Sequence, residues 1–204
     1  MFSKAMLRCG GETIRPISLR AGPLTMMFEP ETAFLRHIRL GDHEALRAIY
    51  AAIRDHNWAT ITPQVAICEQ EIKADSFRIV FDAICRRGPV DYFWKGTVTG
   101  DANGRVCFTF DGESHSDFQR NRIGICVLHP IVECAGRAVA IGHSDGGTEQ
   151  GDFPSAISPH QPFFDIKSIA CEVANTGITA KLEMDGDIFE MEDQRNWRDR
   201  KSVV

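Results

Sequence analysis

Residues 92–110 read Tyr92-Phe93-Trp94-Lys95-Gly96-Thr97-Val98-Thr99-Gly100-Asp101-Ala102-Asn103-Gly104-Arg105-Val106-Cys107-Phe108-Thr109-Phe110. Two alternating runs, 92–98 and 106–110, flank the segment Asp101-Ala102-Asn103-Gly104. Glycine near the turn is typical of a hairpin loop. The stretch therefore predicts two antiparallel strands joined by a tight turn, and Asp185-Gly186-Asp187 joins the last two strand-like runs in the same way.

Strand signals recur along the chain with turn signals between them. The runs are 24–28, 34–40, 64–72, 77–84, 91–98, 106–110, 123–128, 138–141, 163–173, 178–184 and 188–191. A helix is the alternative for 43–54, where apolar residues stand at helical spacing: Leu46, Ile49, Tyr50 and Ile53. However, Gly41-Asp42 is a good turn after the preceding strand, and Ala48-Ile49-Tyr50 is compatible with β-structure. The pattern predicts an all-β fold, mainly an antiparallel β-sandwich, with at most one short helix.

The bulk composition excludes several classes of protein. The chain has 204 residues, 43% of them apolar and 25% charged, which is typical of a globular domain. Its net charge is −5 and its basic residues are scattered, so no nucleic acid partner is expected. No run approaches the roughly 20 apolar residues that span a membrane, and the start lacks a secretory apolar segment. We expect a cytoplasmic protein without a membrane partner.

Seven cysteines form an odd set without a C-x-x-C pair. Four of them lie in apolar strand-like runs: Cys68, Cys85, Cys107 and Cys126. This pattern favours buried, reduced thiols over disulfides or a zinc site.

A serine motif follows the apolar run 138–141. Gly142-His143-Ser144-Asp145-Gly146 matches G-x-S-x-G, which in α/β-hydrolases places the nucleophile on a tight turn between a strand and a helix. The next residues, 147–154, have no helical periodicity and end in Pro154. A polar loop is therefore favoured over a nucleophile elbow.

Histidines and carboxylates in the second half could compose a metal site or an acid/base pair. The candidates are His129, His143, His160, Asp145 and Asp165. None has the spacing of a known ligand motif such as H-x-x-x-H. For His129, which precedes a proline at a strand end, we expect a hydrogen-bonded histidine at the rim of a sheet.

Polar residues are dense at strand ends, and sandwich loops cluster at two ends, so these residues could converge on one rim or interdomain surface. The candidates are Arg122, His129, His143, Asp145, Gln161, Asp165, Glu192, Asp193, Arg195, Asn196 and Trp197. The alternative is a set of solvated loops with ion pairs such as Arg195 with Glu192 or Asp165. The closing segment, 190–197, gathers six polar side chains before a tryptophan and is expected to pack on a further part of a protein.

Six segments together carry a family resemblance. They are Leu19-Arg20-Ala21-Gly22-Pro23-Leu24, Arg54-Asp55-His56-Asn57-Trp58, Asn121-Arg122-Ile123-Gly124 with Val127-Leu128-His129-Pro130, His143-Ser144-Asp145-Gly146, Gln161-Pro162-Phe163-Phe164-Asp165 and 189–197. With these motifs, the chain resembles the N-terminal β-rich domain of the bacterial D-apionate lactonases. The resemblance implies hydrolysis of D-apionolactone to D-apionate in the breakdown of the plant pentose apiose.

The resemblance also implies a domain organisation. We expect an N-terminal extension over 1–18, the lactonase-like domain over 19–197 and a non-native tail over 198–204, because the family continues where this tail begins. A small sugar lactone and the missing C-terminal domains are the expected partners, and the 204-residue chain is expected to be inactive alone. No catalytic residue is assigned, and no metal or cofactor site is evident.

Two further functions stay open. One is a carbohydrate-binding or scaffolding sandwich without catalysis, in which Trp58, Trp94 and Trp197 stack on sugars or pack on a neighbouring domain. The other is a free-standing serine esterase built on Ser144. Activity that is lost in Ser144→Ala would support the esterase.

Overall fold

The computed structural model describes residues 15–197, so the predicted tail over 198–204 and most of the predicted extension lie outside the described residues. Strand β1 (Ile17–Ala21) already begins within the predicted extension. The chain divides into two compact units. Among the described residues, the first contains 15–42 together with Leu46–Leu128, and the second contains His43–Ala45 and 129–197.

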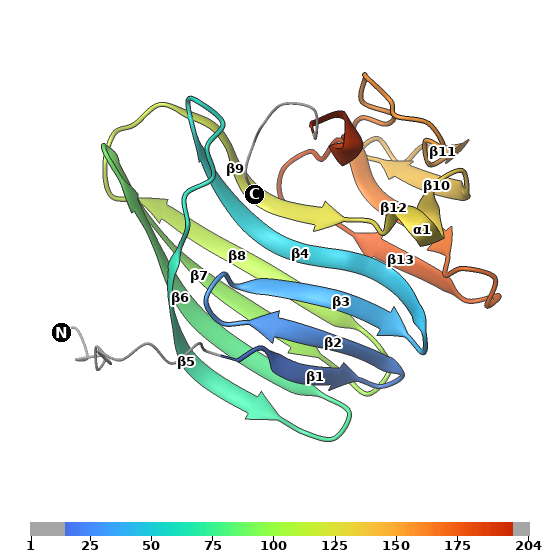
Figure 1. The fold of residues 1–204 in the computed structure, drawn as a ribbon, viewed down its shortest axis with the longest axis horizontal. Coiled ribbons are helices and arrows are strands. Elements are labelled where there is room, and N and C mark those ends of the chain that lie inside the picture. The colour runs from blue at the N-terminus through green and yellow to red at the C-terminus, as the bar shows by residue number, and fades with distance from the viewer. Residues whose placement is uncertain (1–14, 198–204) are drawn as a thin grey trace. The chain divides into compact units, whose positions relative to one another are not determined.

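Two antiparallel sheets build the first unit (Figure 1). The five-stranded sheet has the order β1-β2-β3-β4-β9, and the four-stranded sheet has the order β5-β6-β7-β8. The remaining strands of the first sheet are β2 (Leu24–Glu29), β3 (Phe34–Leu40), β4 (His43–Asp55) and β9 (Arg120–Leu128). Those of the second are β5 (Gln64–Ile72), β6 (Phe77–Arg87), β7 (Val90–Gly100) and β8 (Val106–Ser114).

The hairpin predicted from residues 92–110 is formed by β7 and β8, which pair antiparallel with Gly96 opposite Phe110. Alternate residues of β7 are buried, as the alternation in the sequence requires. In the turn, the Asp101 carboxylate accepts hydrogen bonds from the backbone N–H groups of Asn103 (2.9 Å) and Arg105 (3.0 Å). Gly104 has a φ of 84°, a left-handed conformation that glycine adopts without strain.

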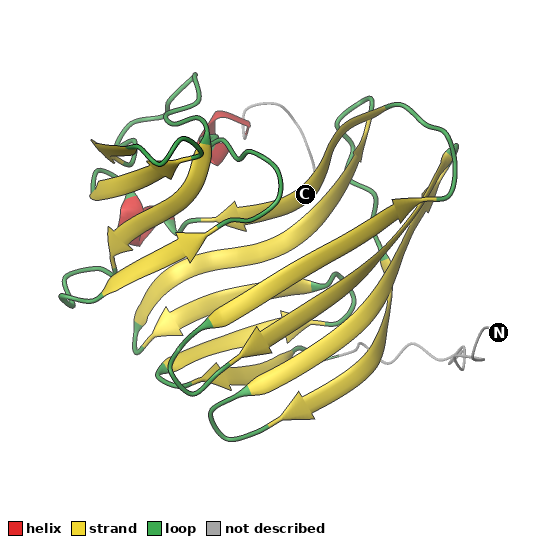
Figure 2. Cartoon of the chain, turned by 180° about the vertical axis from the view of Figure 1, so that it is seen from behind, coloured by secondary structure: helices red, strands yellow, loops and turns green. Residues whose placement is uncertain are grey.

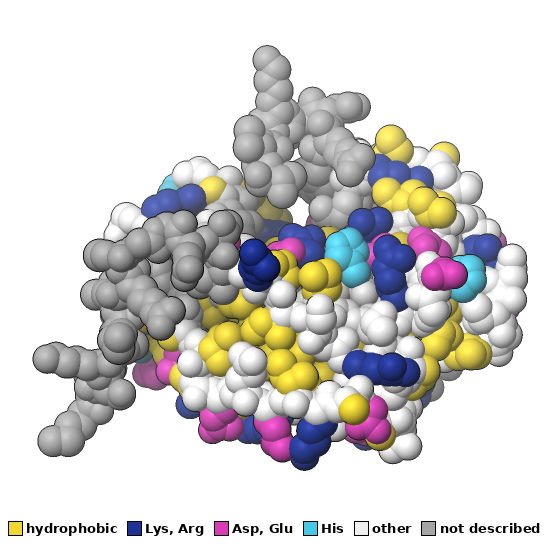
Figure 3. All heavy atoms as spheres, turned by 60° about the horizontal axis from the view of Figure 1, so that its bottom comes forward, with side chains coloured by type: hydrophobic (Ala, Val, Ile, Leu, Met, Phe, Trp, Pro, Cys, Tyr) yellow, Lys and Arg dark blue, Asp and Glu magenta, His cyan; other side chains and the backbone are white. Residues whose placement is uncertain are grey.

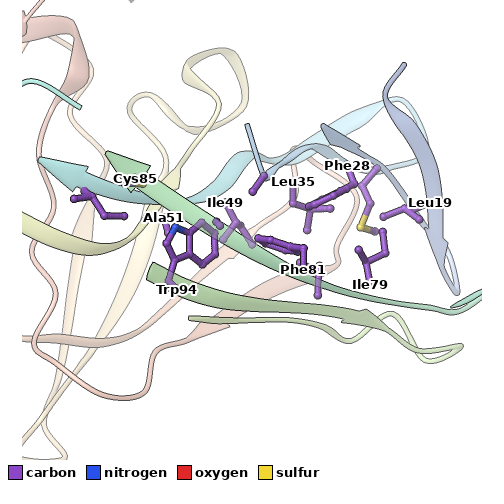
Figure 4. Packing of buried hydrophobic residues seen from close by; sticks show 14 of the residues in the cluster. Leu19, Phe28, Leu35, Ile49, Ala51, Ile79, Phe81, Cys85 and Trp94 are labelled. Carbon is purple, nitrogen blue, oxygen red and sulfur yellow. The ribbon is translucent and has the colours of Figure 1, made fainter. Parts of the chain in front are cut away.

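One apolar core lies between the two sheets of the first unit (Figure 4). Phe81 of β6 contacts Phe28 of β2 with ring centroids 5.3 Å apart, and it meets Trp94 of β7 edge-on at 5.1 Å. A Cβ added to Gly96 would clash with the Phe81 ring, so the strand passes over this aromatic ring only with glycine there. Face-to-face packing of antiparallel sheets confirms the predicted sandwich.

The helical alternative for residues 43–54 is wrong, because this segment forms strand β4. Ile49 and Ile53 are buried in the core and the half-buried Leu46 packs against it, whereas Tyr50 falls on the opposite alternation of the strand from Ile49 and Ile53. Antiparallel pairing with β9, for example Ala48 opposite Leu128, satisfies the backbone. Long-range pairing therefore overrides a spacing that fits a helix by coincidence.

The second unit contains a smaller antiparallel sheet of order β11-β10-β12-β13. Its strands are β10 (Ala138–His143), β11 (Thr148–Asp152), β12 (Ile166–Glu172) and β13 (Thr179–Glu183). They enclose a separate core with Val139, Ile141 and Ile166. In the described part of the chain, the only α-helix is the four-residue α1 (Ile131–Cys134), as the all-β prediction allows (Figure 2).

Two expectations for the second unit need correction. Residues 148–152 were expected in a loop but form β11, since their backbone pairs with β10 although they carry no apolar pattern. Conversely, the predicted strand 188–191 makes only an isolated bridge, between Phe189 and Ile166. It is followed by the short 3-10 helix η1 (Gln194–Trp197).

Candidate functional site

The G-x-S-x-G motif is the turn of a β-hairpin. His143 donates its backbone N–H to the Gly147 carbonyl at 2.9 Å, and the Asp145 carboxylate accepts the Gly147 N–H at 2.7 Å. Strand β11 follows this turn, whereas a nucleophile elbow needs a helix whose N-terminus stabilises the oxyanion. The polar-loop prediction is therefore confirmed, and Asp145 has a structural role within its own turn.

His143 and Asp165 come together beside this hairpin. The His143 Nδ1 atom lies 3.2 Å from the Asp165 carbonyl oxygen, and Nε2 lies 3.4 Å from a carboxylate oxygen of Glu149. The backbone N–H of Ser144 donates to Asp165 Oδ2 at 3.3 Å. An imidazole between oxygen acceptors can hold and transfer a proton. Glu149 is a member of this group that polarity alone did not single out, because it lies in the unpredicted strand β11.

Asp165 has two unusual features. Its φ of 51° is left-handed, which costs a non-glycine residue about 1 kcal/mol or more. Its Oδ1 atom is buried and has no hydrogen-bond partner within residues 15–197. Backbone strain and an unsatisfied polar atom both concentrate at functional sites, so Asp165 is the strongest candidate for chemistry in the second unit.

Arg195 and Asp193 form a clamp on the loop after β11. The Arg195 guanidinium donates to the carbonyl oxygens of Pro154 (2.8 Å), Ser155 (3.0 Å) and Ala156 (3.0 Å) and to the Asp193 carboxylate (2.8 Å). Hydrogen bonding to Arg195 lowers the pKa of Asp193 to about 2.

Asp193 also accepts the backbone N–H of Ser158 at 2.9 Å. The expectation that Arg195 pairs with Glu192 or Asp165 is wrong. The Arg195 guanidinium pairs with the Asp193 carboxylate instead, because the two side chains are only two residues apart in the same segment. Part of the polar segment 190–197 therefore finds its partners inside the unit.

His129 is not the hydrogen-bonded rim histidine that we expected. Both of its ring nitrogens are buried, and neither has a hydrogen-bond partner among the residues described. The ring packs on Phe153 with centroids 5.0 Å apart. Burial lowers the pKa of His129 to about 4, because desolvation disfavours the charged imidazolium. The side chain is thus neutral at pH 7 and packs as an aromatic group.

The remaining candidates lie in other segments of the described chain. Gln161 is half-buried in the segment before β12, Glu192 is half-buried and Asn196 is exposed. Trp197 ends η1. Arg122 belongs to the first unit, so the eleven candidates are divided between the two units.

In the first unit, Arg122 lies over the ring of Trp58, with its Cζ atom 5.8 Å from the ring centroid. Trp58 is 50% exposed and has a left-handed φ of 65°, a rare conformation for a bulky residue. By contrast, Trp94 is 1% exposed, so the expectation that it stacks on a sugar or a neighbouring domain is wrong.

The loop that carries Trp58 is fixed by hydrogen bonds. The Asp55 carboxylate accepts the N–H groups of Asn57 (2.9 Å) and Ala59 (3.0 Å). It also pairs with Arg87 at 2.6 Å. Asn121 donates to the carbonyl oxygens of Asp55 (3.0 Å) and His56 (2.7 Å), which ties the loop to β9. The loop therefore holds the exposed tryptophan in a defined position.

Several general features of the described residues bear on function. Between residues 15 and 197, no helix is long and apolar enough to cross a membrane, and no three His, Cys, Asp or Glu side chains group as metal ligands. On the face in Figure 3, basic side chains are interspersed with acidic and apolar ones. Cys68 and Cys107 are free but exposed, so the expectation of burial is wrong for them, since each lies on the solvent side of an outer strand of its sheet.

Most of the chain is similar to known proteins. Residues 8–201 match the family described as D-apionate lactonase, N-terminal domain. A protein of Brucella anthropi named D-apionate lactonase is 38% identical over 187 residues, which cover 91% of this chain. The chain spans 30% of the length of that relative.

Proposed function

Because the chain belongs to the D-apionate lactonase family through its N-terminal domain, we propose that it forms part of an enzyme that hydrolyses D-apionolactone to D-apionate. The match over residues 8–201 carries this proposal. The reaction would serve the cytoplasmic breakdown of apiose. The all-β fold with two sheets in its larger unit is the scaffold that this domain contributes.

Lactone opening sets chemical requirements that the domain meets only in part. The reaction needs an activated water, donors that stabilise the tetrahedral oxyanion and a proton for the ring oxygen. In the second unit, His143 between Glu149 and the Asp165 carbonyl is a group that can transfer a proton. Ser144 lies in a hairpin turn without a following helix, which disfavours it as a nucleophile. We infer that the parts of the enzyme beyond this domain supply the main catalytic groups.

Expressing the 204-residue chain beside a full-length family member that contains it tests the proposal. D-Apionolactone is added, and ring opening is followed by NMR and by acid release. We expect turnover by the full-length protein and none by the 204-residue chain. No lactone hydrolysis by the full-length protein would refute the proposal, whereas equal rates would place all catalytic groups in this domain. Ser144→Ala in the full-length protein is expected to keep its rate.

A second candidate function is carbohydrate binding without catalysis. The exposed Trp58 beside Arg122 favours it, because aromatic faces stack on sugar rings and the loop is held in place before binding. Binding of the lactone by the chain without turnover, lost in Trp58→Ala, would support this function. Hydrolysis of the lactone by the chain, with no binding that depends on Trp58, would exclude this function.

A further inference from the structure

A hollow of about 920 Å³ opens at one end of the first unit. It is lined by residues 113–118 together with Tyr92, Arg120 and Ile123, so it lies where β8 leads into β9. The volume is within the range of sites for small molecules. None of these residues was a predicted candidate.

The loop over the hollow is fastened to the neighbouring turn between β6 and β7. Ser116 donates its hydroxyl to the Pro89 carbonyl at 2.7 Å and accepts the Asp91 N–H at 2.9 Å. The His115 N–H donates to the Asp91 carbonyl at 2.8 Å. The Ser114 hydroxyl donates to the Ser116 carbonyl at 2.7 Å. These bonds fix the backbone of the loop, so the loop side chains that line the hollow project from fixed positions.

Two carboxylates at this loop have no structural role in the described chain. Glu113 and Asp117 are exposed, and neither makes a hydrogen bond or ion pair within the part of the chain that is described. The exposed Arg120 lies on the same lining. The half-buried Phe118 adds aromatic surface, and its ring is supported edge-to-face at 6.5 Å by the buried Tyr92. Acceptors, a guanidinium donor and an aromatic surface around one hollow are the groups that recognise a sugar ring.

We propose that this hollow binds a neutral carbohydrate in its ring form. Hydroxyl groups of the sugar donate to Glu113 and Asp117, Arg120 donates to a ring or hydroxyl oxygen, and the apolar face of the ring lies on the half-buried Phe118. Because two carboxylates and one guanidinium line the hollow, it favours a neutral sugar over a sugar acid. The proposal goes beyond lactone hydrolysis, because binding here requires no reaction.

The test is an NMR titration of the 204-residue chain, with backbone amide shifts as the readout. Methyl β-D-xylopyranoside is the neutral probe, and D-gluconate is the anionic probe. Saturable shifts are expected over residues 113–118 with the xyloside and much weaker ones with gluconate. The proposal would be overturned if the xyloside shifted only residues outside 113–118, or if gluconate shifted 113–118 equally. It would also be overturned if calcium chloride alone gave the same shifts.

Matched variants locate the binding groups. Asp117→Asn and Glu113→Gln keep size and remove charge at exposed positions, so folding is expected to be preserved and is checked by thermal unfolding. Each is expected to weaken xyloside binding about tenfold, the effect of losing one charge-assisted hydrogen bond. Glu71→Gln, at an exposed carboxylate on β5, is the control and keeps wild-type affinity. Unchanged affinity in both hollow variants would refute the assignment. Lactone turnover in the full-length protein is measured separately, so failure of either proposal is distinguishable.

Discussion

His129 makes the stability of the second unit depend on pH. Burial lowers its pKa from 6.5 to about 4 in the folded chain. As the pH falls below about 6.5, the unfolded chain binds a proton on this histidine, whereas the folded chain does so only near pH 4. The contribution of His129 to stability is therefore complete above about pH 6.5 and is lost progressively as the pH falls toward about 4.

The size of this loss follows from the shift. The pKa moves from 6.5 to about 4, and one unit corresponds to about 1.4 kcal/mol. The wild-type chain should therefore lose on the order of 3 kcal/mol through His129 across this interval. His129→Leu has similar size and no titratable group. Its altered packing on Phe153 is expected to cost about 1 kcal/mol at every pH, so this cost cancels when two pH values are compared.

Urea unfolding at about pH 7 and about pH 4.5, followed by circular dichroism, measures the effect. Carboxylates also titrate in this interval, so the informative quantity is the difference between wild type and His129→Leu. The wild type should lose about 2–3 kcal/mol more than the variant. His160→Leu removes an exposed histidine from the same unit and is the control, expected to behave as wild type. Equal losses in wild type and His129→Leu would refute the argument that burial keeps this histidine neutral.

Three further outcomes are expected. Arg195→Ala should destabilise the second unit and speed hydrogen exchange over 154–158, because three backbone carbonyls and the Asp193 carboxylate lose their donor. Lys181→Ala, in an exposed ion pair, is the control and should cost less than about 0.5 kcal/mol. Equal costs in urea unfolding would contradict the clamp. Because the pKa of Asp193 is lowered to about 2, the free energy of unfolding should fall by on the order of 1–2 kcal/mol as the pH falls from about 4 to about 2. In urea unfolding, Asp193→Asn should abolish this loss of stability. Gly96→Ala should destabilise the first unit by about 3 kcal/mol through overlap with Phe81, and a wild-type midpoint of thermal unfolding would contradict that packing.

The sequence predicted those parts of the fold that depend on local pattern. Alternation in residues 92–110, with a glycine in the turn, identifies β7 and β8, because each strand buries one face and the turn chemistry is local. Strand β11 escaped prediction because its five residues carry no apolar alternation. It is a strand because its backbone pairs with β10, and its own sequence carries no sign of this pairing.

Strand β4 shows why periodicity alone is ambiguous. Its apolar residues fit a helix, yet thirteen residues form an extended strand paired with β9. The deciding factor is the partner strand, more than 60 residues further along the chain, which supplies the hydrogen bonds. Within the local sequence, only the turn at Gly41-Asp42 favours a strand over a helix for residues 43–54.

The candidate site was less predictable than the fold, because polarity does not tell a structural group from a free one. Asp193 and Arg195 satisfy backbone atoms some 40 residues away, and Asp145 closes its own turn, so these side chains are committed to the fold. A charged group that already holds backbone carbonyls binds a ligand only by giving up those bonds. Glu113 and Asp117 differ, since the loop between them is fastened by other residues and leaves both carboxylates free of partners in the described chain. Functional candidates are therefore better chosen by which polar groups the fold leaves unused than by where polar residues gather in the sequence.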